Sequence, residues 1–498
     1  MAEENQSTSY GNIFKTTFLF GFVQLFKAVI GVVKNKIAAV LIGAEGMGVL
    51  GIFSTTLLMI QTGAGLGVNQ SAVRDISEAN GSGDYNKFSK IISITNKVIL
   101  YTGLLGCATT LVLSYWLSYW TFGDNAHIIS YCILSLVVAF NIVNDSKQAI
   151  LKGMRQLRSL AKASMIGSAT GLLLTAPLYY FFGIDGIVPE LLIAAIITVL
   201  VSDYYVRKIQ YDKQTLSVSD LYKESKPMIQ MGIALMTVTF LQTIVAFVIN
   251  AYIRSKGGLE DVGYYSAGTV ITNSYFGLIV SALMTDYYPR IAAVNKDNNA
   301  LQEELNKQSI VSIILCCPMF VLFISLLPVF ISILYSSSFL PAVDFVKWSV
   351  FGTMITVCSN QVDMILVAKF QTKVFLIICI IFRFIQIVLC VGLYSIYGLE
   401  GLGFSYFLLG ILHMTIMCIT VYKLYGITFN STFVKIAFGV CFMVVLSSSL
   451  SNIETLKIRV FLSGALVLLS IAYTYVVTKR TLNIDVFQYI ANRFLKIK

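Results

Sequence analysis

The segment FKAVIGVVKNKIAAV, residues 26–40, places three lysines in an otherwise apolar stretch. Ionisable side chains at membrane depth are costly, and they usually face a bundle interior or a water-filled cavity. Lys34 and Lys36 lie near one end of the stretch, from which long side chains can reach the headgroup region. Lys27 lies near the middle. It is therefore predicted to line a cavity and to meet an anionic group, whereas for Lys34 a cavity role and an interfacial role stay open.

The spacing of these residues supports a cavity face on the helix. Gln24, Lys27, Gly31 and Lys34 follow one another at i, i+3, i+7 and i+10, which places them on one side of an α-helix. Gln24, Lys27 and Lys34 are the predicted substrate-binding residues of this helix, and the ligand they select is anionic.

A second group of polar residues lies in later apolar runs, at equal places in two halves of the chain. The stripe comprises Asn141, Asn144, Asp145 and Gln148, and the positions 215 residues later hold Thr356, Ser359, Asn360 and Asp363. One interpretation is a shared cavity wall that binds substrate through Asn144, Asp145, Gln148, Asn360 and Asp363. The other is hydrogen bonding between neighbouring helices, which is common in membranes.

Charged pairs suggest further roles. Arg383 lies at a depth similar to that of Asp363 in the adjacent run, so we expect an intramembrane Asp363–Arg383 pair, structural or part of a switch, with the structural role favoured. Arg74 and Asp75, and in the second half Asp286 and Arg290, end corresponding runs. They are candidates to gate the cytoplasmic mouth, although ordinary interface charges are the simpler interpretation.

The elements that must position these residues are membrane-spanning helices. Of 498 residues 57% are hydrophobic and 12% are charged, against about 25% charged in soluble domains, so the chain is an all-α polytopic membrane protein. A span needs about 20 apolar residues. The test predicts fourteen spans, at 13–42, 47–73, 90–121, 126–151, 162–182, 187–206, 228–254, 262–290, 306–335, 341–368, 373–397, 401–423, 432–450 and 458–478.

The distribution of Lys and Arg predicts the orientation. Connections after even-numbered spans, with the C-terminal segment, hold 25 of these residues, and those after odd-numbered spans hold four. Because cytoplasmic loops carry the excess of positive charge, both termini are predicted to be cytoplasmic.

The chain also repeats itself. GAEGMG at 43–48 matches GLEDVG at 258–263, and GIDGI at 183–187 matches GLEGL at 398–402, both at an offset of 215. Because each repeat contains an even number of spans, both halves have the same orientation in the membrane, and a substrate site is expected between them. The predicted domains are 1–215 and 216–430, each a six-helix lobe, followed by a helix pair and cytoplasmic tail at 431–498.

The residues that enzymes and metal sites need are not arranged for them. The nine cysteines show no CxxC spacing and there are only two histidines, so neither a metal nor another cofactor is expected. There is no Gly-rich phosphate loop before a lysine and no Ser/His/Asp constellation. The chain is therefore predicted not to be an enzyme. His413 is interpreted as a packing or hydrogen-bonding residue in preference to a proton relay.

Four segments carry a resemblance to a known family. They are KIAAVLIGAEGMGVLGIFSTTLLMIQTGAGLGVNQSAVRDISEA (36–79), ILKGMRQLRSLAKASMIGS (150–168), VSALMTDYYPRIAAV (280–294) and ILVAKFQTKVF (365–375). With them the chain resembles Wzx-type flippases of the multidrug/oligosaccharidyl-lipid/polysaccharide exporter superfamily, most closely those that move O-antigen or common-antigen repeat units.

The resemblance implies two six-helix lobes in a V arrangement and alternating access. It implies a cargo of oligosaccharide on undecaprenyl pyrophosphate, moved to the periplasmic leaflet, and a cationic cavity that would suit Lys27 and Lys34. The polar stripe would then hydrogen-bond sugar hydroxyls. A polysaccharide polymerase and a chain-length regulator would be partners. Nucleic acid is not an expected partner, because the cations flank hydrophobic runs instead of forming a basic patch on a soluble face. Many relatives have twelve spans, so the last pair, 432–478, is a departure.

Several questions stay open at this level. The driving force is a proton or a sodium gradient. The alternatives are an ion-coupled drug or metabolite antiporter of the same architecture, against which the lysines of the first span argue, and a membrane enzyme of polysaccharide assembly. The latter would need a sizeable extracytoplasmic loop, and no connection is long enough to form one.

Overall fold

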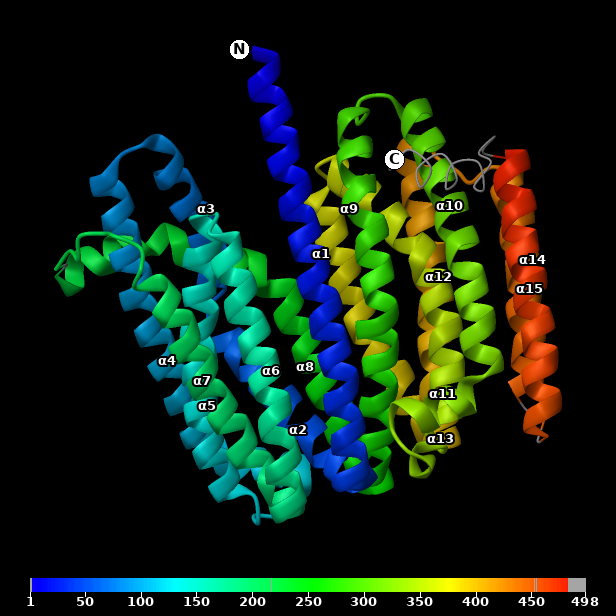
Figure 1. The fold of residues 1–498 in the computed structure, drawn as a ribbon, viewed down its shortest axis with the longest axis horizontal. Coiled ribbons are helices and arrows are strands. Elements are labelled where there is room, and N and C mark those ends of the chain that lie inside the picture. Colours follow the sequence, from blue (N-terminus) through cyan, green and yellow to red (C-terminus); the bar gives the residue numbers. More distant parts are fainter. Residues whose placement is uncertain (1, 216, 452, 454, 482–498) are drawn as a thin grey trace, which may run out of the picture. The chain divides into compact units, whose positions relative to one another are not determined.

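The protein is helical throughout the part that the structure describes (Figure 1). This computed structural model describes residues 2–481 except 216, 452 and 454, and it describes side chains from residue 21 onward, Val218 excepted. Residues 482–498, the predicted cytoplasmic tail, lie outside the described residues. The chain forms two compact units, 1–263 and 264–498, each of which is described by itself. The predicted lobe boundaries at 215 and 430 stay predictions.

Unit 1 is a bundle of long antiparallel helices. Its elements are α1 (Ala2–Leu41), α2 (Gly43–Ala64), α3 (Val68–Ser82), α4 (Tyr85–Phe122), α5 (Ile128–Gly153), α6 (Leu157–Phe182), the short η1 (Gly183–Gly186), α7 (Ile187–Val206) and, as far as residue 263, α8 (Val218–Val270). Helix α5 packs against both α4 and α7, and α6 packs against α1 and α7, as Figure 1 shows.

Unit 2 continues from the end of α8. Its further elements are the π-helical turn η2 (Ile271–Phe276), α9 (Gly277–Ala293), α10 (Asn298–Ser325), α11 (Leu327–Leu334), η3 (Ser337–Phe339), α12 (Ala342–Ala368), α13 (Thr372–Tyr425), α14 (Ser431–Ser451) and α15 (Leu456–Thr481). Helix α12 packs along α13, and α10 packs against α14 and α15. A buried cluster that includes Tyr287, Leu301, Val362 and Met417 joins α9, α10, α12 and α13.

The helices confirm an all-α polytopic membrane protein. Ten segments of the described chain are long and apolar enough to span a membrane. Three of them are longer than 45 residues and contain a break, at 183–186, Gly258 and Gly398, so each comprises two predicted spans. The prediction of one span at 47–73 is wrong in one respect, because α2 ends at Ala64 and α3 starts at Val68.

The backbone repeats at the offset of 215 that the sequence motifs show. Gly43 and Gly258 have φ of 65° and 83°, and Gly183 and Gly398 have φ of 56° and 60°. Two further positions, neither of them glycine, share this conformation at the same offset: Arg155 at φ 54° and Phe370 at φ 58°. Non-glycine residues rarely adopt positive φ. Their recurrence at one offset therefore shows that both halves make the same turns.

The repeated motifs also pack on each other within unit 1. A Cβ built at Gly48 would overlap the carbonyl oxygen of Leu259, and one at Gly263 would overlap that of Ala44. Gly48 and Gly263, like Ala44 and Leu259, are 215 residues apart. The contact is therefore locally symmetric, and it needs glycine on both sides because small residues let helix backbones approach closely in membranes.

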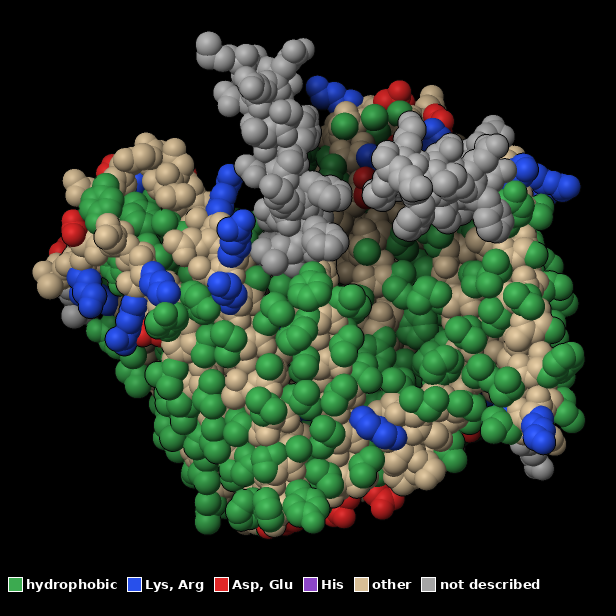
Figure 2. Space-filling model, viewed as in Figure 1, with side chains coloured by type: hydrophobic (Ala, Val, Ile, Leu, Met, Phe, Trp, Pro, Cys, Tyr) green, Lys and Arg blue, Asp and Glu red, His purple; other side chains and the backbone are tan. Residues whose placement is uncertain are grey.

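The surface of the helices is apolar, as a lipid environment requires. Figure 2 shows hydrophobic side chains along the helices, while Lys and Arg of unit 1 gather mainly at the end where α3 lies, which is the predicted cytoplasmic end. Large exposed side chains of this apolar surface include Val112, Leu173 and Phe181. The surface pattern agrees with a membrane-spanning bundle.

The close approach at Gly48 leads to a test of the symmetric contact. Gly48→Ala should lower the free energy of unfolding by about 1–3 kcal/mol, because the added methyl must displace a backbone carbonyl. Thermal unfolding of the purified protein in detergent measures the change. Gly81→Ala is the matched control, since no atom lies within 4 Å of a Cβ there. Equal stability of the two variants would contradict the contact.

Candidate functional site

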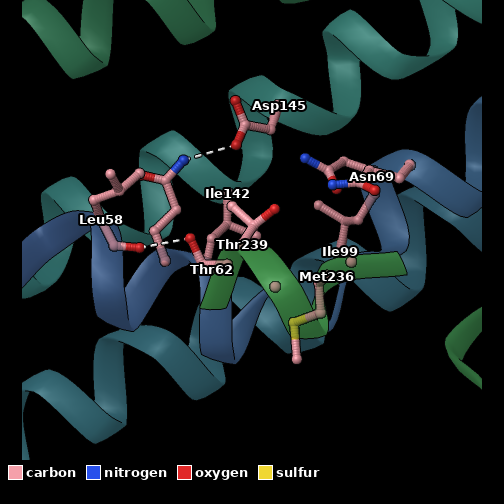
Figure 3. Close-up of a pocket in the computed structure, with 12 residues that line it drawn as sticks. Leu58, Thr62, Asn69, Ile99, Ile142, Asp145, Met236 and Thr239 are labelled. Carbon is pink, nitrogen blue, oxygen red and sulfur yellow. Dashed lines mark hydrogen bonds between the residues drawn. The ribbon is translucent and has the colours of Figure 1, made fainter. Parts of the chain in front are cut away.

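A polar pocket lies inside unit 1, between α2, α3, α4, α5 and α8 (Figure 3). Its volume is about 200 Å³, below the roughly 300–1,000 Å³ of drug-sized ligand sites, so it can hold only part of a large ligand. Its lining residues are Leu58, Gln61, Thr62, Gly65, Gly67, Asn69, Gln70, Ile99, Ile142, Asp145, Met236 and Thr239. Amides, hydroxyls and one carboxylate thus share the wall with aliphatic side chains.

The turn between α2 and α3 brings these polar groups together. Gly65 N–H donates to the carbonyl of Gln61, and the chain then passes through Leu66 at φ 49° and Gly67 at φ 62°. A Cβ at Gly67 would overlap the carbonyl of Gly232, so the turn is pressed against α8. Leu66 is a strained position, because non-glycine residues pay a steric cost in this region. The break lets Asn69 of α3 face the same space as α2.

Hydrogen bonding within the pocket is uneven. Gln61 Nε2 donates to Asp145 Oδ2 at 2.7 Å, the contact drawn in Figure 3, and the Thr62 hydroxyl donates to the carbonyl of Leu58. The side chains of Asn69 and Gln70 have no hydrogen-bond partner among the described residues. Because an amide offers both donors and an acceptor, these two side chains are free to bind the hydroxyls of a ligand.

The predicted cation Lys34 has a partner that the sequence did not reveal. Its Nζ lies 2.8 Å from Oε1 of Glu190 on α7, whose side chain is fully buried while that of Lys34 is 28% exposed. The Tyr179 hydroxyl, from α6, lies 3.5 Å from the other oxygen of Glu190. Three helices therefore meet at one buried carboxylate, and the charge of Lys34 is already neutralised.

Lys27 and Gln24 differ from Lys34. Both are exposed on α1, and neither makes a hydrogen bond or ion pair with another residue whose side chain the structure describes. Neither belongs to the wall of the polar pocket. Of the two lysines, Lys34 is thus paired, whereas Lys27 has no partner among the side chains that the structure describes.

The other predicted residues of unit 1 divide between two roles. Asn144 accepts a hydrogen bond of 2.7 Å from Ser202 on α7, which is the helix-to-helix bonding that the sequence left open, whereas Asp145 lines the pocket. Gln148 is half-buried. Arg74 donates to Asp75 through Nε and Nη2, at 2.9 and 2.7 Å, so these two candidate gating residues pair with each other.

In unit 2, Arg290 ties α9 to α10. Its Nε lies 3.0 Å from Asp286, Nη1 lies 2.5 Å from Glu304, and Nη2 donates to Gln308. Arg290 and Asp286 thus belong to an ion-pair network at the predicted cytoplasmic ends of these helices. A network of this kind can hold one arrangement of the two helices, and the gating role stays a prediction.

The predicted ion pair between Asp363 and Arg383 does not form. Arg383 donates to Gln386 one turn along α13, at 2.8 Å. Asp363 is buried on α12, and its Oδ1 lies 3.8 Å from His413 Nε2. A similar depth in adjacent helices was not sufficient for the two residues to pair, because the rotation of each helix about its own axis decides which side chains face each other. Asn360, the remaining member of the predicted stripe, is half-buried.

The sequence contained signals for the residues that were missed. Glu190 is an acidic residue inside the predicted span 187–206, and acidic residues within a membrane usually pair with a cationic or hydrogen-bonding group. Gln61, Asn69 and Gln70 are polar residues within the predicted span 47–73. Among the described residues no group of three or more His, Cys, Asp or Glu side chains is placed to hold a metal ion.

Comparison with known proteins gives a family and a fold. The model of the family "Polysaccharide biosynthesis protein" matches residues 13–295, more than half of the chain. A Shigella flexneri protein named "Putative O-antigen transporter" is 24% identical over 290 residues, which are 56% of this chain and 66% of that protein, just under two thirds of its length.

Two solved structures share the fold. One is a lipid II flippase MurJ in an inward closed conformation, with a TM-score of 0.71 and 15% identity over 94% of this chain and all of that chain. The other is an inward-facing multidrug resistance MATE family transporter of the MOP superfamily, with a TM-score of 0.66 and 18% identity over 80% of this chain and 95% of that chain. At these identities the likeness concerns the fold alone.

The Lys34–Glu190 pair leads to a test by a double-mutant cycle. Lys34→Met should lower the free energy of unfolding by about 3–5 kcal/mol, since it leaves a buried carboxylate unpaired. The double variant Lys34→Met/Glu190→Gln should recover most of that loss. Unfolding of the purified protein in mixed micelles gives the four free energies.

The matched control is the exposed pair Lys87–Glu78, 2.9 Å apart with side chains 45% and 65% exposed. Exposed pairs contribute little because water already solvates both charges, so its cycle should show little coupling. If the Lys34–Glu190 cycle were as small as the control cycle, the buried pair would not hold the three helices together.

Proposed function

Because this chain belongs to the polysaccharide biosynthesis protein family, we propose that it is a flippase for lipid-linked oligosaccharides. Its cargo is an oligosaccharide repeat unit on undecaprenyl pyrophosphate, carried from the cytoplasmic to the periplasmic leaflet for O-antigen, capsule or a related surface polysaccharide. The family match and the name of the Shigella relative support the class of cargo. The fold shared with a lipid II flippase is consistent with it.

Lys27 carries this proposal. A pyrophosphate cannot enter a low-dielectric region without a countercharge, because the desolvation cost of an ion there is several kcal/mol even after relaxation. Lys27 supplies a compact ammonium near the middle of α1, and no described side chain neutralises it. Lys34 is already paired with Glu190. Lys27 therefore binds the pyrophosphate, and Lys34 shapes the bundle around it.

The polar pocket of unit 1 suits sugars. It combines the Gln61–Asp145 pair with the unpartnered amides of Asn69 and Gln70, and a sugar ring presents hydroxyls that both donate and accept. At about 200 Å³ the pocket takes one part of the oligosaccharide. A small, adaptable polar wall matches a carrier that must bind its cargo and release it again in each cycle.

The remaining features of the proposal complete the cycle. The polyprenyl tail stays in the lipid while the pyrophosphate and sugars cross, and the protein alternates between states open to each side of a bacterial cytoplasmic membrane. Both termini lie in the cytoplasm, as the Lys and Arg distribution predicts. A polysaccharide polymerase and a chain-length regulator receive the cargo on the far side.

The first test removes the charge of Lys27. Lys27→Ala should abolish surface glycan in a strain that depends on this protein, with the lipid-linked intermediate accumulating in the inner leaflet, because the pyrophosphate loses its countercharge. Lys27→Arg should retain part of the activity. Immunoblots of surface glycan and of the protein measure export and abundance.

The matched control for Lys27 is Lys162→Ala, which removes another exposed lysine from unit 1, near the start of α6. It should export glycan at the wild-type level. Full export by Lys27→Ala, at equal abundance, would rule out Lys27 as the group that binds the carrier.

A second test separates sugar recognition from carrier recognition. Gln61→Leu should raise the KM for glycosylated carrier several-fold, because a hydrogen-bonding group of the pocket is lost and Asp145 is left unpaired. Binding of undecaprenyl pyrophosphate without sugars should stay unchanged. Translocation assays in proteoliposomes give the KM, and equal losses for both ligands would contradict a sugar role.

A further inference from the structure

In unit 2, one oxygen atom of a buried carboxylate faces a histidine and accepts no hydrogen bond from any described residue. Asp363 of α12 is only 9% exposed, and its Oδ1 has no hydrogen-bond partner among the described residues. The imidazole of His413 on α13 faces this oxygen, with Nε2 3.8 Å away, and it is cationic only when it is protonated. That distance is too long for a hydrogen bond and short enough for strong attraction in a low-dielectric environment.

The other nitrogen of His413 is fixed by a hydrogen bond. Its Nδ1 lies 2.5 Å from the Ser359 hydroxyl, one turn before Asp363 on α12. The Phe382 ring packs edge-on against the imidazole. When the hydroxyl donates to Nδ1, the proton of a neutral imidazole is on Nε2, the nitrogen nearer to Asp363. The pair is therefore prearranged on two packed helices.

Among the described residues, His413 is the one basic side chain within ion-pair distance of Asp363. The titratable groups that face the pair are Cys379, Cys418 and Arg383, all on α13, and Arg383 donates to Gln386. The Tyr287 hydroxyl of α9 donates to the carbonyl of Gln361, and the buried Ser309 and Ser312 of α10 hydrogen-bond the side chain of Gln361, so these polar groups already have partners. An ionised carboxylate in this place is unfavourable unless a positive charge joins it.

A proton is the ligand that this arrangement fits. The carboxylate and the imidazole can share one proton, and its uptake turns an unpaired negative charge into either an ion pair or a neutral acid beside a neutral ring. Histidine is suited to this role because it gains and loses a proton near neutral pH. A metal ion is not favoured, since among the described residues no group of three or more His, Cys, Asp or Glu side chains is placed to hold one.

We propose that Asp363, His413 and Ser359 form a proton-binding site in unit 2, and that proton uptake and release at this site are coupled to transport. The proton binds to the carboxylate or the imidazole from one side and leaves from the other, and no other bond is made or broken. Protonation changes the attraction between α12 and α13, and so favours one arrangement of these helices. The coupling to transport rests on the proposed function, whereas proton binding itself does not.

Proton binding is tested without any cargo. Infrared difference spectra of the full chain in lipid vesicles, recorded between about pH 5 and 8, should show a protonated-carboxyl band or an imidazolium band that grows as the pH falls. Asp363→Asn should remove the band, and Ser359→Ala and His413→Gln should each shift its pH dependence. His127→Gln changes the other histidine of the chain and is the control. A wild-type band that persists in Asp363→Asn would overturn the site.

Coupling is tested in proteoliposomes with fluorescently tagged undecaprenyl-pyrophosphate oligosaccharide. A pH gradient should raise the wild-type translocation rate several-fold over the rate at equal pH. In Asp363→Asn that ratio should fall to about one, while exchange at equal pH continues, and His127→Gln should behave as wild type. A wild-type ratio in Asp363→Asn would overturn the coupling.

The two proposals fail in different ways. Absence of translocation by the wild type under every gradient would contradict the proposed function, and the infrared result would stand by itself. Asp363→Asn is nearly isosteric with the native residue, and the milder Ser359→Ala keeps the test decisive if that variant does not fold. An infrared titration by Ser359→Ala identical to that of the wild type would contradict the role of Ser359.

Discussion

An ionised side chain inside a membrane bundle has to be neutralised, and this constraint organises the interior of each unit. Glu190 is fully buried, and Lys34 approaches it from another helix to within 2.8 Å. Because the desolvation of both charges is offset only when the pair is well placed, α1 and α7 must keep their relative height and rotation. In the proposed function, this pairing withdraws Lys34 from ligand binding, and Lys27, which has no partner among the described side chains, is the cation that binds the carrier.

Backbone hydrogen bonds impose a second constraint. In lipid every backbone N–H and C=O group needs a hydrogen-bond partner within the protein. The helices are therefore interrupted only at turns of defined backbone conformation. The repeated turns at Gly43 and Gly258, and at Gly183 and Gly398, meet this need in the same way. The halves differ where the function is proposed to lie: unit 1 breaks at 65–67 beside the polar pocket, and the second half has η2 near the corresponding place.

Unit 2 contains charged side chains in two kinds of surroundings. Arg290 has three partners on two helices, whereas Asp363 faces an imidazole whose charge depends on protonation. A permanent ion pair stabilises one packing arrangement. A pair whose charge varies can stabilise two, which is a property that an alternating carrier needs. By the proposal made above, Glu190 is a structural carboxylate and Asp363 is a switchable one.

The sequence by itself determined the helices, their repeat and the family, because spans of about 20 apolar residues, Gly-rich turns and cationic loops are local properties. It also identified Lys27, Lys34 and Asp145 as intramembrane polar residues, and the structure places Asp145 in the pocket. Only the tertiary structure decided which residues the intramembrane polar side chains contact. Lys34 contacts Glu190, Asp145 contacts Gln61, and Asp363 faces His413 instead of Arg383. Each partner lies on another helix, and the rotation of one helix against the next follows from packing of the whole bundle, which no single span encodes.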